Sequence, residues 1–161
     1  MIDKDFVQIF ATSCEINNNR ELMESYLSEL EKKRTMKILG RNVTWLICGE
    51  NNVLRNIQSN SNRVEFGLQG VPGLKERFEK IYQNTEIFVN PTHTIMGNQG
   101  KLNMRREFLS RNGVYISTSN ADTSRGQRLD YSSIQYVYQN GRKLEGTVME
   151  ESERFVLKNM K

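Results

Sequence analysis

The chain has 161 residues, enough for one globular domain with a buried core. Its 23 basic and 19 acidic side chains give a net charge of +4, and so mild an excess does not favour binding to nucleic acid. No apolar run reaches the roughly 18 residues of a membrane span, the N-terminus lacks the pattern of a signal peptide, and two cysteines make no disulfide scaffold, so we expect a cytoplasmic, reduced protein.

The first predicted elements are a strand and an amphipathic helix, which together make up residues 1–35. The strand covers residues 6–13, where apolar and β-branched residues predominate. The helix begins after the asparagines at 17–19, which are favoured capping residues, and ends near the basic cluster at 32–34. Its apolar residues recur at the helical period: Leu22, Met23, Tyr26, Leu27 and Leu30. Residues 36–161 follow as the larger part of the same compact domain.

Three apolar segments, at residues 43–48, 86–90 and 114–118, are predicted strands. The first is a nearly continuous apolar run, which is typical of a strand covered on both faces. Trp45 is therefore expected in the core. Pro91 is expected to stop the second strand.

Helices alternate with these strands. The spacing of apolar residues predicts helices over 74–82 and 101–112, and Gly113 is expected to end the second. A short strand is predicted within 64–70. This alternation favours a layered α/β fold with a mixed sheet.

The C-terminal part is predicted to form a β-hairpin. Its strands cover residues 134–138 and 143–148, on either side of Asn140-Gly141, a strong local signal for a hairpin turn. A last strand is predicted at 154–157.

Polar clusters close the three apolar strands, at residues 48–52, 90–94 and 117–122. In open α/β sheets, ligands bind outside the carboxyl ends of the strands. If these strands are parallel neighbours, the three clusters meet at one site.

Cys48 is a candidate nucleophile in the first of these clusters. A thiol at a strand end can be presented to a pocket, and the following Gly49 lets the backbone approach a substrate oxygen. Glu50 could orient an amine or position a water. The alternative is that Cys48 is an ordinary buried cysteine, since cysteine is among the most frequently buried residue types.

His93 is the one histidine of the chain. It could form a nucleophilic pair with Cys48, because both follow strands, or it could close a turn through hydrogen bonds. A single histidine without an acidic cluster makes a zinc site improbable. The other cysteine, Cys14, precedes Glu15 and is assigned a structural role. No glycine motif for binding phosphate is present.

The segment NVTWLICGENNVLRN resembles the nucleophile segment of the nitrilase superfamily, the carbon–nitrogen hydrolases. EIFVNPTHT resembles the family strand that ends in Asn-Pro. MRREFLSRNGVYISTSNAD is similar to the helix and strand that follow, and SSIQYVYQNGRKLEGTVMEESERFVL is similar to the closing hairpin. The resemblance covers residues 36–158, with these segments in the family order.

This resemblance implies a four-layer α-β-β-α sandwich and hydrolysis of an amide or nitrile without a cofactor or metal. Cys48 would be the nucleophile and Gly49 a backbone donor to the oxyanion. The residues expected to take part in catalysis are Cys48, Gly49 and Glu50, and those expected to bind substrate are Asn51, Asn90, His93 and Asn120. The family's general-base glutamate and its lysine precede the cysteine in a half of the sandwich for which 47 residues are too few.

Three interpretations follow from that shortage. The chain is a fragment, one of two chains that complete the sandwich, or a half-size relative that has lost activity. We therefore expect a homo-oligomer or a complementary chain that supplies the missing half. The rival function is a non-catalytic binding or assembly module for an acidic or nucleic-acid partner. A small nuclease is a third alternative, but the sequence shows no paired acidic metal site.

Overall fold

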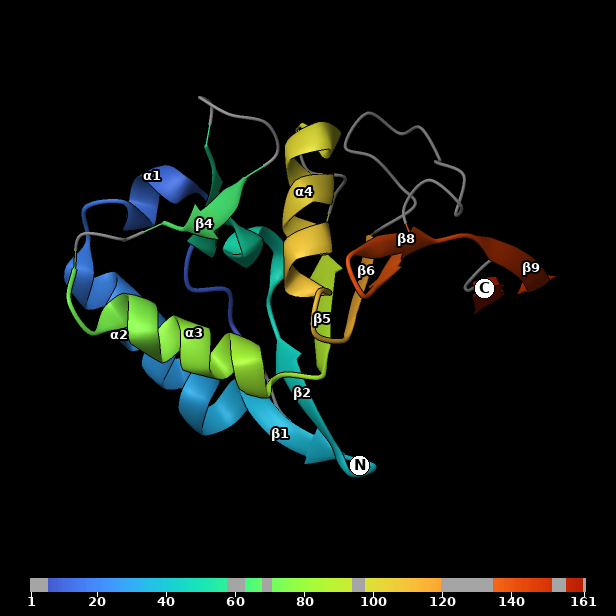
Figure 1. The fold of residues 1–161 in the computed structure, drawn as a ribbon, viewed down its shortest axis with the longest axis horizontal. Helices are drawn as coiled ribbons and strands as arrows, with labels where there is room; N and C mark the ends of the chain where they lie inside the picture. Colours follow the sequence, from blue (N-terminus) through green and yellow to red (C-terminus); the bar gives the residue numbers. More distant parts are fainter. Residues whose placement is uncertain are drawn as a thin grey trace.

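The computed structural model describes residues 6–57, 63–67, 71–93, 98–119, 135–151 and 156–160. Within them the chain forms a mixed α/β structure around a six-stranded mixed sheet (Figure 1), so the predicted class is confirmed. The sheet has the order β1-β2-β5-β6-β7-β8, with bounds Thr35–Ile38, Arg41–Trp45, Ile87–Thr92, Val114–Ser119, Gln135–Gln139 and Arg142–Leu144. Two-stranded sheets pair β3 (Leu54–Asn56) with β4 (Val64–Phe66), and β9 (Gly146–Glu151) with β10 (Val156–Met160).

The helices of the described residues are short to medium in length. Their bounds are α1 Ser13–Ile16, α2 Arg20–Glu29, α3 Leu74–Asn84 and α4 Gln99–Leu109, with a π-helical turn η1 (Leu30–Arg34) extending α2 and a 3₁₀ helix η2 (Cys48–Val53) after β2. The predicted asparagine cap is confirmed, because the side chain of Asn19 accepts a hydrogen bond from Leu22 N at 3.0 Å. None of the helices in the described ranges has the length and apolar content needed to cross a bilayer.

The centre of the sheet is parallel. β2 pairs in parallel with β5, and β5 pairs in parallel with β6, whereas β1, β7 and β8 join in antiparallel pairs. The three predicted apolar strands are therefore parallel neighbours, as the clustering argument required. Their carboxyl ends lie at one edge of the sheet.

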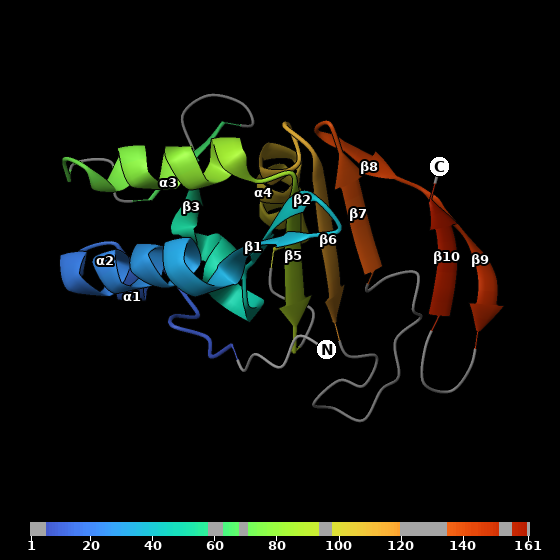
Figure 2. The same cartoon turned by 90° about the horizontal axis from the view of Figure 1, so that it is seen from below.

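The longer helices cover one face of the sheet. In Figure 2, α4 lies behind the strands and α2 and α3 extend beyond the side of the sheet where β1 and β2 lie. Residues of all three helices belong to one core cluster with residues of β5, β6 and β7. The strand residues that point to this side, Phe88, Tyr115 and Tyr138, are at most 2% exposed and join the hydrophobic core with the helices. The core therefore lies between one helical layer and one face of the sheet.

The opposite face of the sheet carries a continuous row of apolar side chains. The strand registers align them across five strands: Trp45, Val89, Ile116, Val137 and Leu144. None of the five belongs to the core cluster of the described residues, and Ile116 is 38% exposed. We call this row the open-face row.

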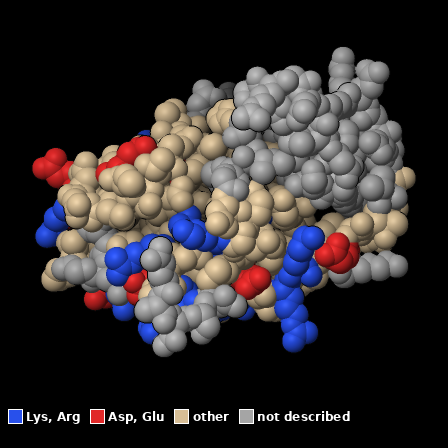
Figure 3. Space-filling view, turned by 90° about the horizontal axis from the view of Figure 1, so that it is seen from above, with Lys and Arg blue, Asp and Glu red and all other residues tan. Residues whose placement is uncertain are grey.

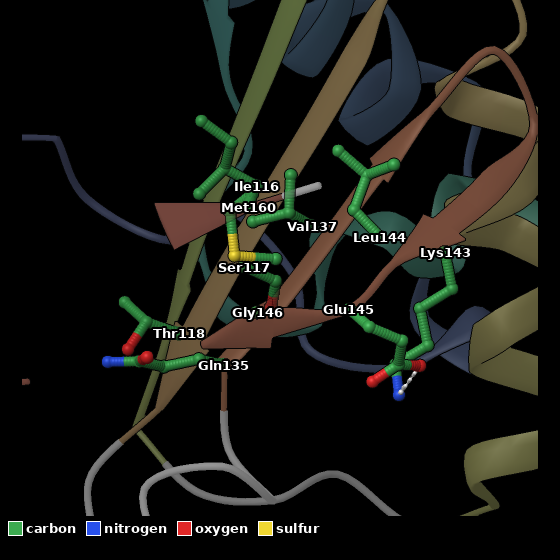
Figure 4. Close-up of a pocket in the computed structure, with 10 residues that line it drawn as sticks. All are labelled: Ile116, Ser117, Thr118, Gln135, Val137, Lys143, Leu144, Glu145, Gly146 and Met160. Atoms are coloured by element: carbon green, nitrogen blue, oxygen red, sulfur yellow. Dashed lines mark hydrogen bonds and ion pairs between the residues drawn. The ribbon is translucent and has the colours of Figure 1, made fainter. Parts of the chain in front are cut away.

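A cavity of about 230 Å³ lies over one end of the open-face row. Ile116, Val137 and Leu144 line it from the sheet, and Met160 of β10 lines it from the other side (Figure 4). The β9–β10 pair thus lies beside this part of the open-face row and leaves a hollow between them.

The predicted strand at residues 6–13 is wrong. Residues 6–10 have no regular secondary structure, and Ser13–Ile16 form α1. Backbone N–H groups of this segment donate hydrogen bonds to side-chain carboxylates rather than to the carbonyls of a neighbouring strand. Ile9 N donates to Glu50, and Ala11 N donates to Glu15. A side chain 41 residues away in sequence thus replaces the strand partner that the local pattern implied.

Trp45 does not lie in the core, contrary to the prediction. It belongs to the open-face row and is half-buried, with its ring centroid 6.0 Å from that of Phe6. The apolar run at 43–48 is also not one strand, because β2 ends at Trp45 and Cys48 begins η2. The helical layer covers only one face of β2. The continuous apolar run predicted a strand covered on both faces, and this prediction was wrong.

Pro91 does not stop its strand, because β5 continues to Thr92. Leu46 N donates to Val89 O on the β2 side, and the backbone groups of residues two apart point the same way. β2 has already ended at that level, so the N–H that proline lacks would have had no partner there.

The predicted hairpin around Asn140-Gly141 is confirmed, with both residues at positive φ (51° and 75°). Its second arm is shorter than predicted. β8 ends at Leu144, and Gly146 begins β9, which pairs with β10 outside the main sheet. A glycine inside the predicted arm weakens a strand and permits this change of direction.

An ion pair between η1 and α3 should make stability depend on pH. Arg77 donates to both carboxylate oxygens of Glu31, and this hydrogen bonding lowers the pKa of Glu31. A lowered carboxyl pKa contributes stability above the unfolded value of about 4.3, which is lost as the pH falls through the folded value. Both side chains are about one-third exposed, so Glu31→Gln should cost at most about 1 kcal/mol at pH 7.

Urea unfolding at pH 7 and at pH 3 measures this difference. The difference in unfolding free energy between the wild type and Glu31→Gln should be smaller at pH 3 than at pH 7. Glu79→Gln, which removes an exposed pair with Lys75 at 3.5 Å, is the control and should have a smaller effect. A difference of the same size at pH 3 and pH 7 would contradict the assignment to the ionised carboxylate.

Candidate functional site

Cys48 lies where β2 gives way to η2, at the edge formed by the carboxyl ends of the parallel strands. Its backbone φ of 49° is in the left-handed region, which residues other than glycine rarely adopt. Its side chain is partly exposed. Backbone strain of this kind gathers at functional sites, because the surrounding structure must hold the residue in place.

Gly49 is required by the close approach of another segment. A Cβ at this position would lie 2.2 Å from the backbone oxygen of Ala11. No side chain fits in that space. The N-terminal segment therefore packs directly against the turn that carries Cys48, and Gly49 N–H lies in the first turn of η2, where helical acceptors are absent.

Glu50 is fully buried and holds the turn together. Its carboxylate accepts hydrogen bonds from the backbone N of Ile9 and Ile47, both at 2.8 Å, and from Arg34 Nη1 at 2.6 Å. Burial raises the pKa of Glu50, while the two N–H groups and the Arg34 guanidinium oppose that rise. With these contacts, Glu50 lies beneath the candidate site and presents no exposed surface to a substrate.

Asn90, on β5, joins the three parallel strands. Its Nδ2 donates to Leu46 O at 3.0 Å and to Cys48 O at 3.1 Å, and its Oδ1 accepts from the Tyr115 hydroxyl of β6 at 2.8 Å. Asn90 and Tyr115 have no exposed surface. The carbonyl of Cys48 is thus fixed by a buried side chain rather than by a neighbouring strand.

A buried polar cluster surrounds the Tyr115 hydroxyl. Burial raises the pKa of Tyr115, and the nearby Arg106, Ser117 and Asn51 act in the opposite direction. These three side chains are at most 4% exposed. We call Asn51, Asn90, Arg106, Tyr115 and Ser117 the polar cluster.

Arg106 and Tyr115 are members that the sequence interpretation did not identify. Charged residues in helices are ordinarily exposed, so Arg106 was not considered as a site residue. The buried positions of α4 are Leu102, Arg105, Arg106 and Leu109, at i, i+3, i+4 and i+7. The helical period therefore placed both arginines on the buried stripe, which was the available signal.

The remaining predicted residues are not all brought together. His93 is exposed just beyond β5, and no hydrogen bond joins it to Cys48 within the described ranges. Asn120 lies outside the described residues. Cys14 is exposed on α1, so it does not have the buried position expected of a structural cysteine.

The described charged side chains do not form a continuous basic surface on the face shown in Figure 3. On the face in Figure 3, described Lys and Arg residues lie among Asp and Glu residues. Several form ion pairs, including Arg41 with Glu86 at 2.6 Å and Lys143 with Glu145 at 3.2 Å. Groups of three or more potential metal ligands among His, Cys, Asp and Glu are absent from the described part of the chain.

Comparisons with models of protein families, with curated proteins and with solved structures found no match to this chain.

Proposed function

We propose that this chain is a nitrilase-like carbon–nitrogen hydrolase domain in which Cys48 attacks the carbon of an amide or nitrile. The observation that carries the proposal is the position of Cys48: a partly exposed thiol at positive φ, at the shared carboxyl edge of three parallel strands. The polar cluster beneath it holds the carbonyl of the same residue. This is how an acyl-transfer nucleophile is presented.

The proposed reaction on an amide has two steps. The Cys48 thiolate adds to the amide carbon, the C–N bond breaks with proton transfer to nitrogen, and a thioester forms as the amine leaves. Water then adds to the thioester, and the acid product and the thiol are released. Backbone N–H groups such as that of Gly49 would stabilise the negative charge that develops on oxygen.

The proposal requires a general base that the described residues do not place at Cys48. Glu50 is engaged with Arg34, and within the described ranges no carboxylate or amine is hydrogen-bonded to the Cys48 thiol. We therefore include in the proposal a second sheet, packed on the open-face row to complete an α-β-β-α sandwich, which carries the base and the lysine. The apolar character of the open-face row supports this arrangement.

Alkylation by iodoacetamide tests the nucleophile. Cys48 should be labelled faster than Cys14 at neutral pH, although Cys14 is the more exposed thiol. Mass spectrometry of tryptic peptides measures both rates in one sample. Cys48→Ser should abolish the fast phase and leave the labelling of Cys14 unchanged. Faster labelling of Cys14, or equal slow labelling of both, would count against the proposal.

The second candidate is a binding or assembly module, which the open-face row favours directly. The row crosses five strands, a width of about 19 Å at the usual strand spacing. Ile116 is exposed and the other four side chains are half-buried, and apolar residues left outside the core over such a width are typical of an interaction surface. We take a second copy of the chain as the partner in this alternative, because two such rows could pack face to face as sheets do in sandwiches.

Sedimentation measurements test this alternative through Ile116. If the chain self-associates through the open-face row, Ile116→Glu should shift it to a monomer with an unchanged far-UV spectrum. Leu39→Glu is the matched control, because Leu39 is also an exposed aliphatic residue (99%) but belongs to the turn between β1 and β2 rather than to the row. A wild-type chain that is monomeric at all concentrations would refute the second-copy assignment and leave the complementary sheet to another chain or segment.

A further inference from the structure

Two side chains of the polar cluster have buried atoms without hydrogen-bond partners in the described structure. They are Asn51, at both amide atoms, and Arg106, at Nε. Asn51 has no exposed surface, and Arg106 is 4% exposed. Buried polar atoms are nearly always hydrogen-bonded, so these atoms have the capacity to bind a further partner.

Arg106 also has no described acidic partner. Its Nη1 donates to Gln99 Oε1 at 3.2 Å and to Asn103 Oδ1 at 2.7 Å, and its guanidinium carbon lies 3.8 Å from the ring centroid of Tyr136. These partners are neutral. Arg34, which is equally buried, is paired with Glu50 at 2.6 Å. Buried charges are normally paired with opposite charges, so Arg106 retains the capacity to bind an anion.

The unpartnered atoms belong to side chains of the buried network that ends at the carbonyl of Cys48. Side chains on a helix lean toward its N-terminus, and Arg106 accordingly reaches back to partners one and two turns earlier on α4. Arg106 and Asn51 both lie near the Tyr115 hydroxyl. That hydroxyl donates to Asn90 Oδ1, and Asn90 Nδ2 donates to the carbonyl of Cys48.

We infer that Arg106 and Asn51 form a subsite for a carboxylate group carried by the substrate, an inference that rests on the proposed function of Cys48. Arg106 Nε and Asn51 Nδ2 would donate to the carboxylate oxygens. A carboxylate is the ligand class that matches, because it supplies the negative charge that the buried guanidinium lacks and accepts from two donors at once. The substrate class is then an amide or nitrile that bears a carboxylate.

Two alkylating reagents of similar shape test the subsite. Iodoacetate carries a carboxylate and iodoacetamide a neutral amide, and both alkylate thiolates. The rate ratio of iodoacetate to iodoacetamide at Cys48 should exceed the ratio measured on N-acetylcysteine amide by about tenfold, the effect of one charge-assisted hydrogen bond. Arg106→Gln should abolish that excess. The readout is the ratio of two rates measured on the same variant, so a change in the general reactivity of the thiol cancels, while the loss of the charge affects the anionic reagent alone.

Arg111→Gln is the matched control. Arg111 follows the same helix and also lies over an aromatic ring, 5.2 Å from the centroid of Phe108, but it is exposed. This variant should keep the wild-type rate ratio. If Arg106→Gln does not fold, Asn51→Ala and Arg106→Lys are used in its place, and each should reduce the excess.

The possible results separate the subsite from the nucleophile. Fast iodoacetamide labelling of Cys48 with the same rate ratio in the wild type and Arg106→Gln would overturn the subsite and leave the nucleophile in place. If Cys48 is inert to both reagents, the proposed function fails, and titration of ¹⁵N-labelled protein with succinate decides the subsite. Saturable shifts at Asn51 that require Arg106 would support it, and no shift, or an equal response to succinamide, would overturn it.

Discussion

Glu50→Gln should lower the free energy of unfolding by about 3–5 kcal/mol, the usual effect of breaking a buried ion pair by removing one partner. The substitution preserves the shape of the side chain but leaves Arg34, which is 1% exposed, without its buried anion. Arg34 retains a longer contact to Glu29 at 3.7 Å, which does not replace the bond to Glu50 at 2.6 Å. Guanidinium unfolding followed by far-UV circular dichroism at pH 7 measures the loss.

Glu86→Gln is a closely matched control for this experiment. Glu86 is also paired with an arginine at 2.6 Å, but Arg41 is 68% exposed and Glu86 is 37% exposed. Solvent screens such pairs, so this variant should change stability little. Equal losses from the two variants would show that burial does not set the importance of the Glu50 contacts.

Gly49→Ala should destabilise the chain by about 3 kcal/mol or more, the upper range for overpacking a close contact. The added methyl group would meet the backbone oxygen of Ala11 at 2.2 Å and its carbonyl carbon at 2.8 Å. Backbone atoms cannot move aside as the end of a flexible side chain can. The N-terminal segment would therefore have to leave the Cys48 turn, which would also disturb the hydrogen bond from Ile9 to Glu50.

Two further variants define the cause of that loss. Gly100→Ala adds the same methyl group in the first turn of α4, where the nearest atom is Asn98 Oδ1 at 3.3 Å, and should stay within about 1 kcal/mol of the wild type. Ala11→Gly should not rescue Gly49→Ala, because the clash is with the backbone of residue 11 rather than its side chain. Thermal unfolding of the four proteins measures these differences, and rescue by Ala11→Gly would contradict the packing argument.

These predictions also separate stability from reactivity at the Cys48 turn. Glu50 stabilises the turn through its ion pair with Arg34, and Gly49 does so through its close contact with the backbone of Ala11. The thiol of Cys48 is partly exposed. We therefore expect Glu50→Gln both to lower the stability of the chain and to slow the labelling of Cys48 by iodoacetamide. The strained backbone at Cys48 depends on the contacts that this variant weakens.

The elements that local patterns predict well are those whose stabilising contacts are near in sequence. α2, α3 and α4 follow the helical spacing of their apolar residues, and the Asn140-Gly141 turn follows from the conformations that those two residues tolerate. The strand at 6–13 and the core position of Trp45 were wrong. In both cases the outcome depended on a distant partner: Glu50 for the first, and the side of the sheet that the helices cover for the second.

Some residues of the candidate site could likewise be predicted from the sequence, and others could not. The polar residues at the ends of the apolar strands could be predicted, because parallel strands bring their carboxyl ends together wherever they pair. Cys48, Asn51 and Asn90 were found by that argument. Arg106 was not, since a charged residue in a helix is ordinarily exposed, and its burial depends on how α4 lies against β6 and β7.

The sequence by itself determined the α/β class and the polar clusters that follow the apolar strands, including the one that begins at Cys48, because hydrophobic periodicity and turn chemistry are local properties of the chain. The parallel pairing that brings these clusters to one edge was decided by the tertiary structure. Only the tertiary structure decided which neighbours the Cys48 turn has. Glu50 is paired with Arg34, Gly49 lies against Ala11, and Arg106 is buried beside Asn51 and Tyr115. Such contacts join residues far apart in sequence, and their energies depend on burial, which no local pattern specifies.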